Sequence, residues 1–380
     1  MTTTVNNEHK NIKVPNLRFK EFEGEWKEER LADIADLYKG TGISKDQLSD
    51  DGEPCILYGE LYTKYKSETI REVISKTNIN NTKLVRSKAN DVIIPCSGET
   101  AEDIATARCV LNGNILLGGD LNIIRLHGYD GAFMSYQLNG RRKYDIAKVA
   151  QGVSVVHLYG EHLKGVKTIN PCLEEQKKIA KLLSLLDERI ATQNKIIDKL
   201  QSLIKGIAQN IVRNNKPNVR ISDCLECNSS TLQESDVCEH GTYPVYGANG
   251  IVGYLKNYNT EGEAVYIIKD GSGVGTVSYV TGKCSATGTL NTLQAKEGYS
   301  LHYLYYLLKV FNFEPYKTGM AIPHIYFKDY GKAKFFCPSY TEQLRYARLL
   351  SAIDNKLSIE QNILTGLTLQ KQCLLRQMFI

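Results

Sequence analysis

The chain reads GVSVVHLYGEHLKGVKTINPCLEEQKKIAKLLSLLDERI at residues 152–190, and a second version of this stretch occupies residues 319–357. The two stretches align without a gap at a constant offset of 167, and 12 of their 39 residue pairs are identical. Unrelated stretches would share about two or three identities. The identical pairs include Gly152 with Gly319, His157 with His324, Tyr159 with Tyr326, Pro171 with Pro338, and Glu175-Gln176 with Glu342-Gln343. The repeat predicts two copies of one structural unit, which can occupy pseudo-twofold positions within the chain.

A long helix is predicted after each proline of the repeat, because apolar residues recur at alternating spacings of four and three, as in coiled-coil heptads. Acidic residues near each start complement the helix dipole. Polar residues interrupt the two seams at equivalent positions, so we expect Gln193 and Glu360 to lie near one another and to fix the register. An alternative is that each helix packs only on its own domain. The first seam is Ile179, Leu183, Leu186, Ile190, Gln193, Ile197, Leu200, Ile204, Ile207 and Ile211; the second is Tyr346, Leu350, Ile353, Leu357, Glu360, Leu364, Leu367, Lys371, Leu374 and Met378.

Chain connectivity sets the expected direction of the two helices. A polar linker at residues 213–218 leads from the first helix to the second domain, so the second helix starts at the far end and runs back antiparallel to the first. The helices would form a spacer of about 60 Å at most, with one domain at each end. The C-terminus would return beside the first domain.

The predicted fold class is α+β, with two mainly β domains separated by two long antiparallel helices that form a coiled coil. The strand-like runs that support this class are residues 91–95, 121–126, 264–268 and 275–280. The expected boundaries are 1–170 for the first domain with its N-terminal extension, 171–213 for the first helix, 214–337 for the second domain and 338–380 for the second helix.

The composition is that of a globular protein with more than one core. A length of 380 residues favours two domains, and 42% hydrophobic with 23% charged residues gives no sign of large disordered regions. The first residues, MTTTVNNEHK, are polar, and no apolar run approaches the roughly 20 residues that a membrane helix needs, so we expect a cytoplasmic protein. Ten scattered cysteines predict free thiols. The net charge of +5 permits a phosphate-facing surface if the basic residues cluster.

Both domains carry loops that suit close contact with a ligand. Each has a Tyr-Gly pair, Tyr58-Gly59 and Tyr246-Gly247, and a Ser/Gly loop after a strand, at 96–100 and 270–276. Such loops let the backbone approach a ligand, although their glycines can equally serve as turns. Tyrosine interleaves with arginine and lysine at 140–144, a pattern that suits bases and phosphates but also fits half-buried strand tyrosines beside a solvated face.

Motifs for catalysis, nucleotide binding or metal binding are incomplete in this chain. Asn170-Pro171-Cys172 lacks the second proline and the aromatic residue of an adenine methyltransferase motif, so a helix-entry turn is favoured. Gly271-Ser-Gly-Val-Gly275 lacks the Gly-Lys-Ser/Thr of a nucleotide loop, which favours a turn. Four side chains could in principle hold zinc, but their irregular spacing favours core or loop positions; they are Cys224, Cys227, Cys238 and His240. For His157 and His324 we expect structural roles, with a DNA-phosphate contact as the second interpretation.

Across nearly its whole length the sequence resembles the specificity subunits of type I restriction-modification enzymes. The likeness rests on the opening Val14-Pro-Asn-Leu-Arg-Phe19 through Phe22 and Trp26, on the Pro-(three residues)-Glu-Gln helix starts at Pro171 and Pro338, and on the Gly…His…Tyr approaches to those helices. The resemblance implies that each domain is a target-recognition domain reading one half of a bipartite, gapped DNA site. It also implies that the helical spacer sets the gap and docks modification subunits, which we expect to number two. The second copy lacks the opening segment and its domain is shorter, so the two halves are expected to read different bases.

The resemblance further implies a non-catalytic chain without a cofactor of its own. S-adenosylmethionine would belong to the adenine-methylating modification subunits, and ATP to restriction subunits that join through the complex. The rival interpretations are a coiled-coil scaffold that does not touch DNA and an enzyme with unrecognised motifs.

The expected partner is double-stranded DNA, with two half-sites about one helical turn apart from centre to centre. Phosphate contacts give salt-dependent affinity, and polar side chains in the grooves read the sequence. The expected phosphate contacts are Lys39, Lys45, Arg141, Arg142, Lys148, Lys256, Lys269, Lys317 and Lys328. The expected base contacts are Tyr58, Ser97, Thr100, Arg108, Tyr246, Asn249, Ser272 and Thr276.

Overall fold

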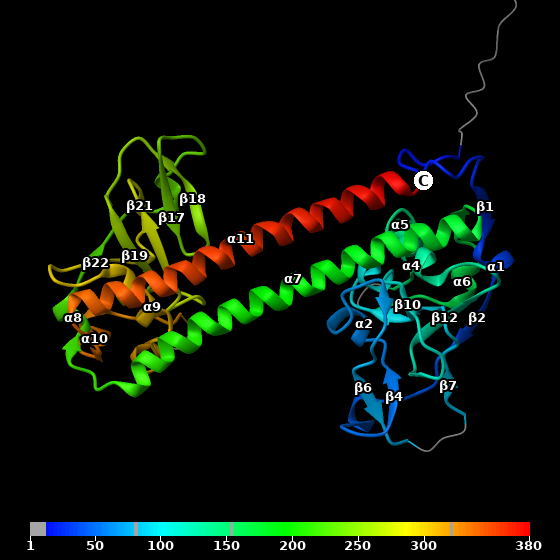
Figure 1. Cartoon of the computed structure of the whole chain (residues 1–380), viewed down its shortest axis with the longest axis horizontal. Coiled ribbons are helices and arrows are strands. Elements are labelled where there is room, and N and C mark those ends of the chain that lie inside the picture. Colours follow the sequence, from blue (N-terminus) through cyan, green and yellow to red (C-terminus); the bar gives the residue numbers. More distant parts are fainter. Residues whose placement is uncertain (1–12, 80–82, 153–154, 320–321) are drawn as a thin grey trace, which may run out of the picture. The chain divides into compact units, whose positions relative to one another are not determined.

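The chain folds into two compact units, Met1–Gln193 with Ile363–Ile380 and Asn194–Asn362. The structure, a computed structural model, describes residues 13–79, 83–152, 155–319 and 322–380. Each unit holds one mainly β domain and a part of two long helices, α7 (Leu173–Asn214) and α11 (Tyr340–Met378) (Figure 1). Within the described ranges, no helix is both long enough and apolar enough to cross a bilayer. The α+β fold class predicted from the sequence is confirmed.

The first unit is built around two five-stranded sheets. One has the order β2-β12-β8-β10-β5 (Ala35–Lys39, Leu121–Leu126, Asp91–Pro95, Arg108–Val110, Thr69–Ile70). The other has the order β3-β6-β4-β11-β7 (Leu48–Ser49, Ser75–Thr77, Glu53–Ile56, Leu116–Leu117, Val85–Arg86). Strand β8 is buried along its whole length, which explains its continuous Val-Ile-Ile run. Two further pairs are β1 (Lys27–Arg30) with β14 (Lys167–Asn170) and β9 (Ser97–Gly98) with β13 (Val156–His157).

The C-terminus returns to the first unit, as predicted, and Met378 and Phe379 pack into the core of that unit. Phe379 is only 2% exposed, and its ring centroid lies 5.2 Å from that of Phe133 and 6.4 Å from that of Trp26. The short helices around this core are α1 (Leu31–Ile34), α2 (Glu60–Thr63), α3 (Ala101–Ile104), α4 (Gly131–Asn139), α5 (Lys143–Val149) and α6 (Gly160–Lys164), with the 3-10 turn η1 (Lys45–Gln47). The first unit is thus completed by residues from both ends of the sequence.

The second unit repeats the main sheet in smaller form. Its four-stranded sheet has the order β16-β22-β19-β20 (Leu225–Ser229, Leu290–Ala295, Glu263–Ile268, Val277–Thr281), the same arrangement as β2-β12-β8-β10. A three-stranded sheet, β18-β17-β21 (Gly250–Leu255, Tyr243–Gly247, Ser285–Ala286), and the pair β15 (Val219–Arg220) with β23 (Lys334–Phe335) complete the strands. The helical segments are α8 (Ile221–Cys224), α9 (Leu301–Lys309), α10 (Phe327–Tyr330), η2 (Glu234–Asp236) and η3 (Glu314–Tyr316). The sequence repeat therefore reflects a repeated fold.

The repeated Pro-(three residues)-Glu-Gln motif has the same hydrogen bonds in both units. Gln176 Oε1 accepts from the backbone N–H of Asp130 at 2.9 Å, and its Nε2 donates to Pro171 O at 2.9 Å. The equivalent Gln343 accepts from Ser300 N at 2.9 Å and donates to Pro338 O at 3.0 Å. Both glutamines are buried, so each joins the start of a long helix to the N-cap of a short helix, α4 or α9.

Replacing either glutamine with alanine should destabilise its own unit by about 1–3 kcal/mol, because two buried backbone groups lose their partners. The chain has one tryptophan, Trp26, and it lies in the core of the first unit, so its fluorescence reports the unfolding of that unit. Gln176→Ala should shift the tryptophan transition in denaturant. Gln343→Ala should leave that transition in place and shift a tyrosine or circular dichroism transition instead; an equal shift of both signals by both variants would contradict the prediction.

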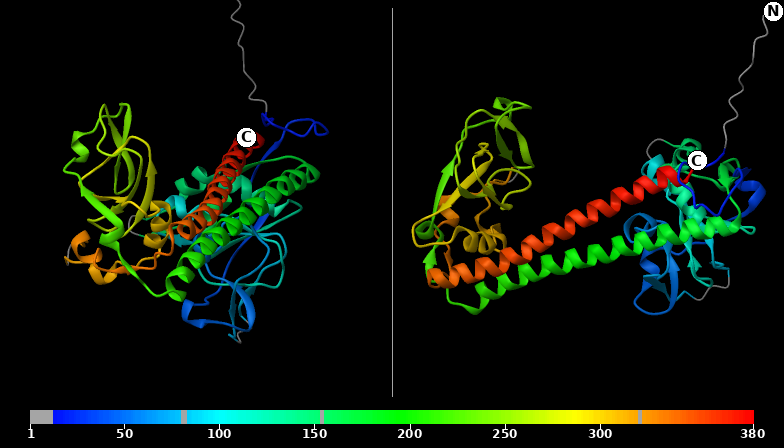
Figure 2. Two further views of the ribbon diagram at one scale, coloured as in Figure 1. Left: turned by 60° about the vertical axis from the view of Figure 1, so that its left-hand side comes forward. Right: turned by 45° about the horizontal axis from the view of Figure 1, so that its top comes forward.

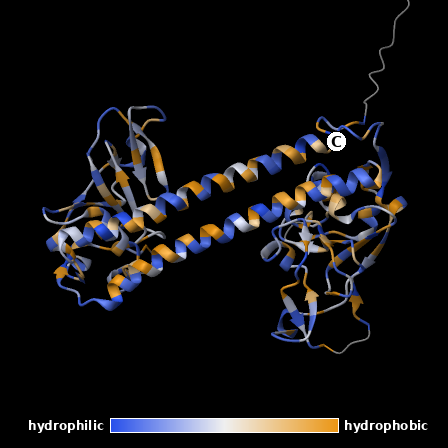
Figure 3. Cartoon of the chain, viewed as in Figure 1, coloured by the Kyte–Doolittle hydropathy of each residue, from blue (hydrophilic) through white to orange (hydrophobic). Residues whose placement is uncertain are grey.

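The heptad seams are the buried faces of α7 and α11. In the described chain, none of the 20 seam positions named above is exposed, and Figure 3 shows apolar residues recurring along both helices. In the first unit, Ile179 and Leu183 of α7 share a core with Met378 of α11. Within each unit the parts of the two helices lie side by side and run in opposite directions (Figures 1 and 2). The predicted antiparallel pairing is confirmed, and the alternative of helices that pack only on their own domains is wrong.

Both polar interruptions of the seams are buried, Gln193 at 7% and Glu360 at 6% exposure. Gln193 belongs to the first unit and Glu360 to the second. Their proximity, the spacer length and the domain boundaries given above stay predictions.

Candidate nucleic-acid interface

In each unit the repeated segment fixes a loop at the end of the central strand. The N–H of Leu158 donates to Cys96 O at 2.8 Å in the first unit, and the N–H of Ile325 donates to Lys269 O at 2.9 Å in the second. Leu158 and Ile325 are equivalent in the repeat, and Cys96 and Lys269 follow the equivalent strands β8 and β19. The two Ser/Gly loops singled out in the sequence are therefore structurally equivalent.

The first unit has a hollow of about 540 Å³ at this loop. It brings together two predicted base contacts, Tyr58 and Ser97, with Tyr62 between them, whose hydroxyl donates to Ser97 O at 3.2 Å. Burial raises the pKa of Tyr62, so its hydroxyl stays a hydrogen-bond donor. Glu99, Asp103 and Val155 also line the hollow. The hollow combines aromatic, hydroxyl and carboxylate groups, which suits the edge of a base.

The third predicted base contact of this loop, Thr100, caps helix α3. Its Oγ1 accepts from the N–H of Asp103 at 3.1 Å and donates to Asp103 Oδ2 at 2.6 Å. The cap fixes the position of the Asp103 carboxylate at the hollow. Glu99 and Asp103 are not among the contacts predicted from the sequence, although carboxylates can accept hydrogen bonds from the amino groups of cytosine or adenine.

Lys39 lies beside the same loop. With Cys96, Asn122 and Tyr159 it lines a smaller groove of about 240 Å³. Burial raises the pKa of the Cys96 thiol to about 11, so the loop begins with a neutral side chain. Lys39, Tyr58, Ser97 and Thr100 are therefore gathered around one loop, whereas Lys45 is the exposed first residue of η1.

The arginines predicted as contacts in the first unit make bonds within it. Arg108 donates to the carbonyl oxygens of Ala107 at 3.0 Å and Tyr65 at 3.3 Å, and burial lowers the pKa of its guanidinium. Arg141 donates to Arg376 O at 2.8 Å, and Arg142 to Ile380 O at 3.3 Å, so both hold the end of α11. Lys148, in the last turn of α5, is exposed.

In the second unit, a histidine of the repeated segment is hydrogen-bonded to an aspartate of the equivalent loop. His324 Nδ1 lies 2.5 Å from Asp270 Oδ1, and both side chains remain about one-third exposed. Ser272 and Thr276, two predicted base contacts, are exposed in the same loop. Lys269, at the start of the loop, is half-buried.

The remaining predicted contacts of this unit lie on two other surfaces. Tyr246 of β17 is half-buried against Tyr266, with ring centroids 5.7 Å apart, while Asn249 and Lys256 at the ends of β18 are exposed. Lys317 donates to Glu314 Oε1 at 2.6 Å, and Lys328 Nζ lies 5.3 Å from the centroid of the Tyr326 ring.

The two repeated histidines differ in their side-chain contacts. His324 forms the pair with Asp270, which agrees with the interpretation of a structural histidine. His157 is exposed, and its ring stacks on Tyr159 with centroids 6.2 Å apart. The second interpretation, a contact with DNA phosphate, stays a prediction for both residues.

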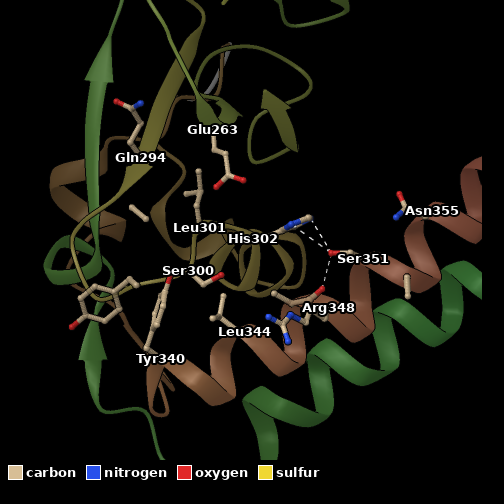
Figure 4. Close-up of a pocket in the computed structure, with 14 residues that line it drawn as sticks. Glu263, Gln294, Ser300, Leu301, His302, Tyr340, Leu344, Arg348, Ser351 and Asn355 are labelled. Carbon is tan, nitrogen blue, oxygen red and sulfur yellow. Dashed lines mark hydrogen bonds between the residues drawn. The ribbon is translucent and has the colours of Figure 1, made fainter. Parts of the chain in front are cut away.

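A larger hollow of about 640 Å³ in the second unit lies away from all predicted contacts, between α9, the first turns of α11 and the sheet (Figure 4). His302 lies in its wall, stacked on Tyr279 and Tyr306, and its ring lies 3.3 Å from Ser351 Oγ. Burial lowers the pKa of His302, so the ring is neutral near pH 7. The hollow therefore presents Glu263 and Arg348 around a neutral, stacked wall and not a basic surface.

The cysteines considered as zinc ligands differ in exposure. Cys224 is buried, Cys227 is half-buried, and Cys238 and His240 are exposed. All ten cysteines are free thiols, as predicted. Among the described residues, no group of three or more His, Cys, Asp or Glu side chains is placed to hold a metal ion.

Comparison with known proteins assigns the repeated fold to a family. The model of the type I restriction modification DNA specificity domain matches the chain twice, at residues 23–202 and 214–369. Curated relatives include the type I restriction enzyme EcoprrI specificity subunit of Escherichia coli, 29% identical over 112 residues, which are 30% of this chain and 28% of the relative. The MjaVIII specificity subunit of Methanocaldococcus jannaschii is 27% identical over 199 residues, 51% of this chain and 44% of the relative. The matches span less than half of these relatives.

A solved structure shows the same fold over the whole length. The crystal structure of the type I restriction-modification S subunit from M. genitalium has a TM-score of 0.71 and 19% identity, covering 97% of this chain and 99% of that one. The family model covers most of the described chain, and each of its two matches covers most of one unit. The chain therefore belongs to the type I restriction modification DNA specificity domain family, with one copy of the domain in each half of its sequence.

Proposed function

We propose that this chain is the DNA specificity subunit of a type I restriction-modification complex, and that each unit reads one half of a bipartite, gapped site. The observation that carries the proposal is the pair of equivalent loops after β8 and β19, which the repeat places in the same way but fills with different side chains. Ser97 and Glu99 in the first loop correspond to Asp270 and Ser272 in the second. Equivalent placement with different chemistry suits two readers of different half-sites.

The 17 DNA contacts named from the sequence are proposed with this function. Support is strongest for the cluster of Lys39, Tyr58, Ser97 and Thr100 and for the exposed pair Ser272 and Thr276. A contact by Arg108 would require its guanidinium to leave the carbonyl oxygens that it now binds. The chain would supply no reaction of its own, and S-adenosylmethionine and ATP would be bound by the modification and restriction subunits.

The proposed docking sites for two modification subunits are exposed apolar residues that recur at equivalent positions of the long helices. Leu182 of α7 and Leu349 of α11 are an identical repeat pair, as are Ile196 and Ile363, and all four are exposed. Single exposed apolar residues are common on protein surfaces, so the recurrence of the same residues at equivalent positions is the observation that supports docking. Their recurrence fits one copy of the same partner on each half.

Leu182→Asp and Leu349→Asp should each weaken the binding of one modification subunit by about tenfold or more, because burying a leucine at an interface contributes roughly 1.5–3 kcal/mol. Native mass spectrometry of the assembled complex should show one subunit in place of two. The matched control is Leu369→Asp, since Leu369 is also exposed on α11 but corresponds to Ser202 in the repeat. If all three variants lost the modification subunit to the same extent, the assignment of Leu182 and Leu349 as docking residues would be contradicted.

The proposed function is tested by co-expressing the chain with its modification subunits and mapping methylated adenines. A two-part motif with a fixed gap is the expected result. Continuous or random methylation would exclude the bipartite reader, and a complex that binds no DNA would favour a scaffold. Methyl transfer by the chain alone would show that it is an enzyme.

A further inference from the structure

The main sheet of the second unit has one strand fewer than that of the first. In the first unit, the outer edge of β10 is paired with β5, which runs parallel to it. The equivalent strand of the second unit is β20, and in the part of the chain that the structure describes it forms the edge of its sheet. The second unit therefore has an open position where the first unit has a fifth strand.

The backbone of β20 is oriented for pairing at this open edge. In the first unit, the N–H of Cys109 in β10 donates to Glu68 O, beside β5, at 2.8 Å. The strand registers place Tyr279 of β20 where Cys109 lies. The N–H of Tyr279 therefore points out of the sheet, as do those of Val277 and Thr281, because the direction alternates along an antiparallel strand.

The sequence of β20 does not protect this edge. Proteins usually guard an edge strand with charged side chains, with proline or with a bulge. Strand β20 reads Val-Ser-Tyr-Val-Thr, without a charge or a proline, and it pairs with β19 without a break in register. Such an edge can accept an extended segment of another chain, which adds to the sheet through main-chain hydrogen bonds.

Two hollows mark the contacts that the residues around β5 make in the first unit. There, the Ser67 hydroxyl donates to Asp187 at 2.9 Å, and the arginine that follows β5 pairs with Glu188 at 2.5 Å. The repeat equivalents of these two carboxylates on α11 are Asp354 and Asn355. Asp354 lines a hollow of about 470 Å³, and Asn355 lines the hollow of about 640 Å³ described above. Open space thus replaces the contacts of this segment in the second unit.

Asp354 also lacks the cation that its equivalent has in the first unit. Asp187 is paired with Lys371 at 2.6 Å, whereas the seam position equivalent to Lys371 is Ile204 in the second unit. Asp354 accepts a hydrogen bond from the Tyr306 hydroxyl at 3.4 Å. Within the described residues, no lysine or arginine forms an ion pair with it. A half-buried carboxylate beside a hollow favours a cation brought by an occupant.

The two lysines that line the same hollow do not take the place of that cation. They are Lys205 and Lys309, and both lie beyond ion-pair distance of Asp354. Lys309 Nζ instead lies 5.2 Å from the centroid of the Tyr305 ring. The carboxylate of Asp354 therefore remains open to a cation from outside the unit.

Resting on the proposed function, we propose that the outer edge of β20 binds an extended segment of one modification subunit. This segment adds a fifth strand to the sheet of the second unit and directs a lysine or arginine to Asp354. The source follows from the position of Leu349, the proposed docking residue, which lies on α11 between Arg348 and Ala352 of the larger hollow. Because the first unit supplies its own fifth strand, only one of the two modification subunits is held in this way.

Hydrogen–deuterium exchange of the wild-type chain, alone and assembled with its modification subunits, tests the added strand. The amides of Val277, Tyr279 and Thr281 should exchange at least about tenfold more slowly in the complex, because they become hydrogen-bonded there. The amides of β10, which already pairs with β5, should exchange at rates within about twofold of each other in the two samples. A photo-crosslinking amino acid at Ser278, which is exposed on β20, should capture a lysine- or arginine-containing peptide of a modification subunit.

Variants separate the backbone of β20 from its side chains. Thr281→Pro removes one outward N–H and should weaken the binding of one modification subunit by about tenfold, while the other binds as before. The matched control is Thr281→Ala, which keeps the N–H and should bind as the wild type does. Asp354→Asn should weaken the same subunit by about threefold to tenfold. Its control is Asp223→Asn, at an exposed position of the same unit, which should have no effect. The circular dichroism transition of the second unit shows that each variant is folded.

Equal exchange of the β20 amides in the chain alone and in the complex would overturn the proposal. So would a crosslink from Ser278 to a second copy of this chain, or an equal loss of binding in Thr281→Pro and Thr281→Ala. If Asp354→Asn bound like Asp223→Asn, the cation assigned to the added strand would be wrong. Failure of the proposed function is a separate result, visible as the absence of a gapped methylation motif with the wild-type chain.

Discussion

Replacing Lys371 with methionine is expected to destabilise the first unit by about 3–5 kcal/mol, because two buried carboxylates lose their cation. Lys371 Nζ lies 2.6 Å from Glu68 Oε2 and 2.6 Å from Asp187 Oδ1. Asp187 also accepts a hydrogen bond from the Tyr136 hydroxyl at 2.7 Å. The cluster joins the β domain to both long helices within the first unit, so it fixes how the helices sit on that domain.

The loss of stability caused by Lys371→Met should grow as pH rises through the neutral range. Burial opposes charge on Lys371, but Glu68 and Asp187 raise its pKa above the usual 10.5, so its stabilising contribution is present at neutral pH and is lost only at higher pH. Burial raises the pKa of Glu68 even with the lysine present. When the pKa of a carboxyl group is higher in the folded state than in the unfolded state, the free energy of unfolding falls as pH rises from the lower pKa to the higher one. Lys371→Met should therefore be closer to the wild type near pH 5 than near pH 8.

Denaturant unfolding followed by the fluorescence of Trp26 measures this loss in the correct unit. The matched control is Lys332→Met, which removes the same charge at an exposed position of the second unit and should change stability by no more than about 0.5 kcal/mol. A Lys371→Met variant within about 1 kcal/mol of this control at pH 8 would show that the cluster does not stabilise the fold.

Phe379→Ala is expected to cost the first unit about 3 kcal/mol, because a buried aromatic ring leaves a cavity between Trp26 and Phe133. The residue is the penultimate one of the printed sequence, where a change would ordinarily be harmless. The fluorescence transition of Trp26 should move to lower denaturant, and the transition of the second unit should stay in place.

Phe379→Leu tests whether volume or the aromatic ring is responsible. It keeps most of the side-chain volume and should recover all but about 1.5 kcal/mol of the loss. If Phe379→Ala unfolded at the same denaturant concentration as the wild type, the packing of the C-terminus in this core would be contradicted.

The sequence predicted the repeated structural unit, the two helices with heptad seams and the return of the C-terminus to the first domain, because these features depend on periodicity and chain connectivity. It could not predict the ion cluster. Lys371 occupies a seam position where the first helix has Ile204, and its partner Glu68 is 303 residues away in the chain. Only the folded unit shows that the ammonium group of Lys371 is paired with the carboxylates of Glu68 and Asp187.

The candidate DNA contacts show a second limit of sequence reasoning. Charge alone favours Arg108, Arg141 and Arg142 as phosphate or base contacts, yet their guanidinium groups bind carbonyl oxygens inside the first unit. Which donors are already used depends on tertiary neighbours, which periodicity and composition do not encode.

The first unit contains residues from both ends of the sequence, whereas the second is one continuous segment, Asn194–Asn362. On the ribosome, synthesis of the second unit is therefore complete before synthesis of the first unit is, although the first unit begins to emerge earlier. Until Met378 and Phe379 leave the exit tunnel, the newly made first domain keeps part of its apolar interior open to water and to chaperones. A stalled or shortened chain would carry a completely folded second unit and an incompletely folded first unit.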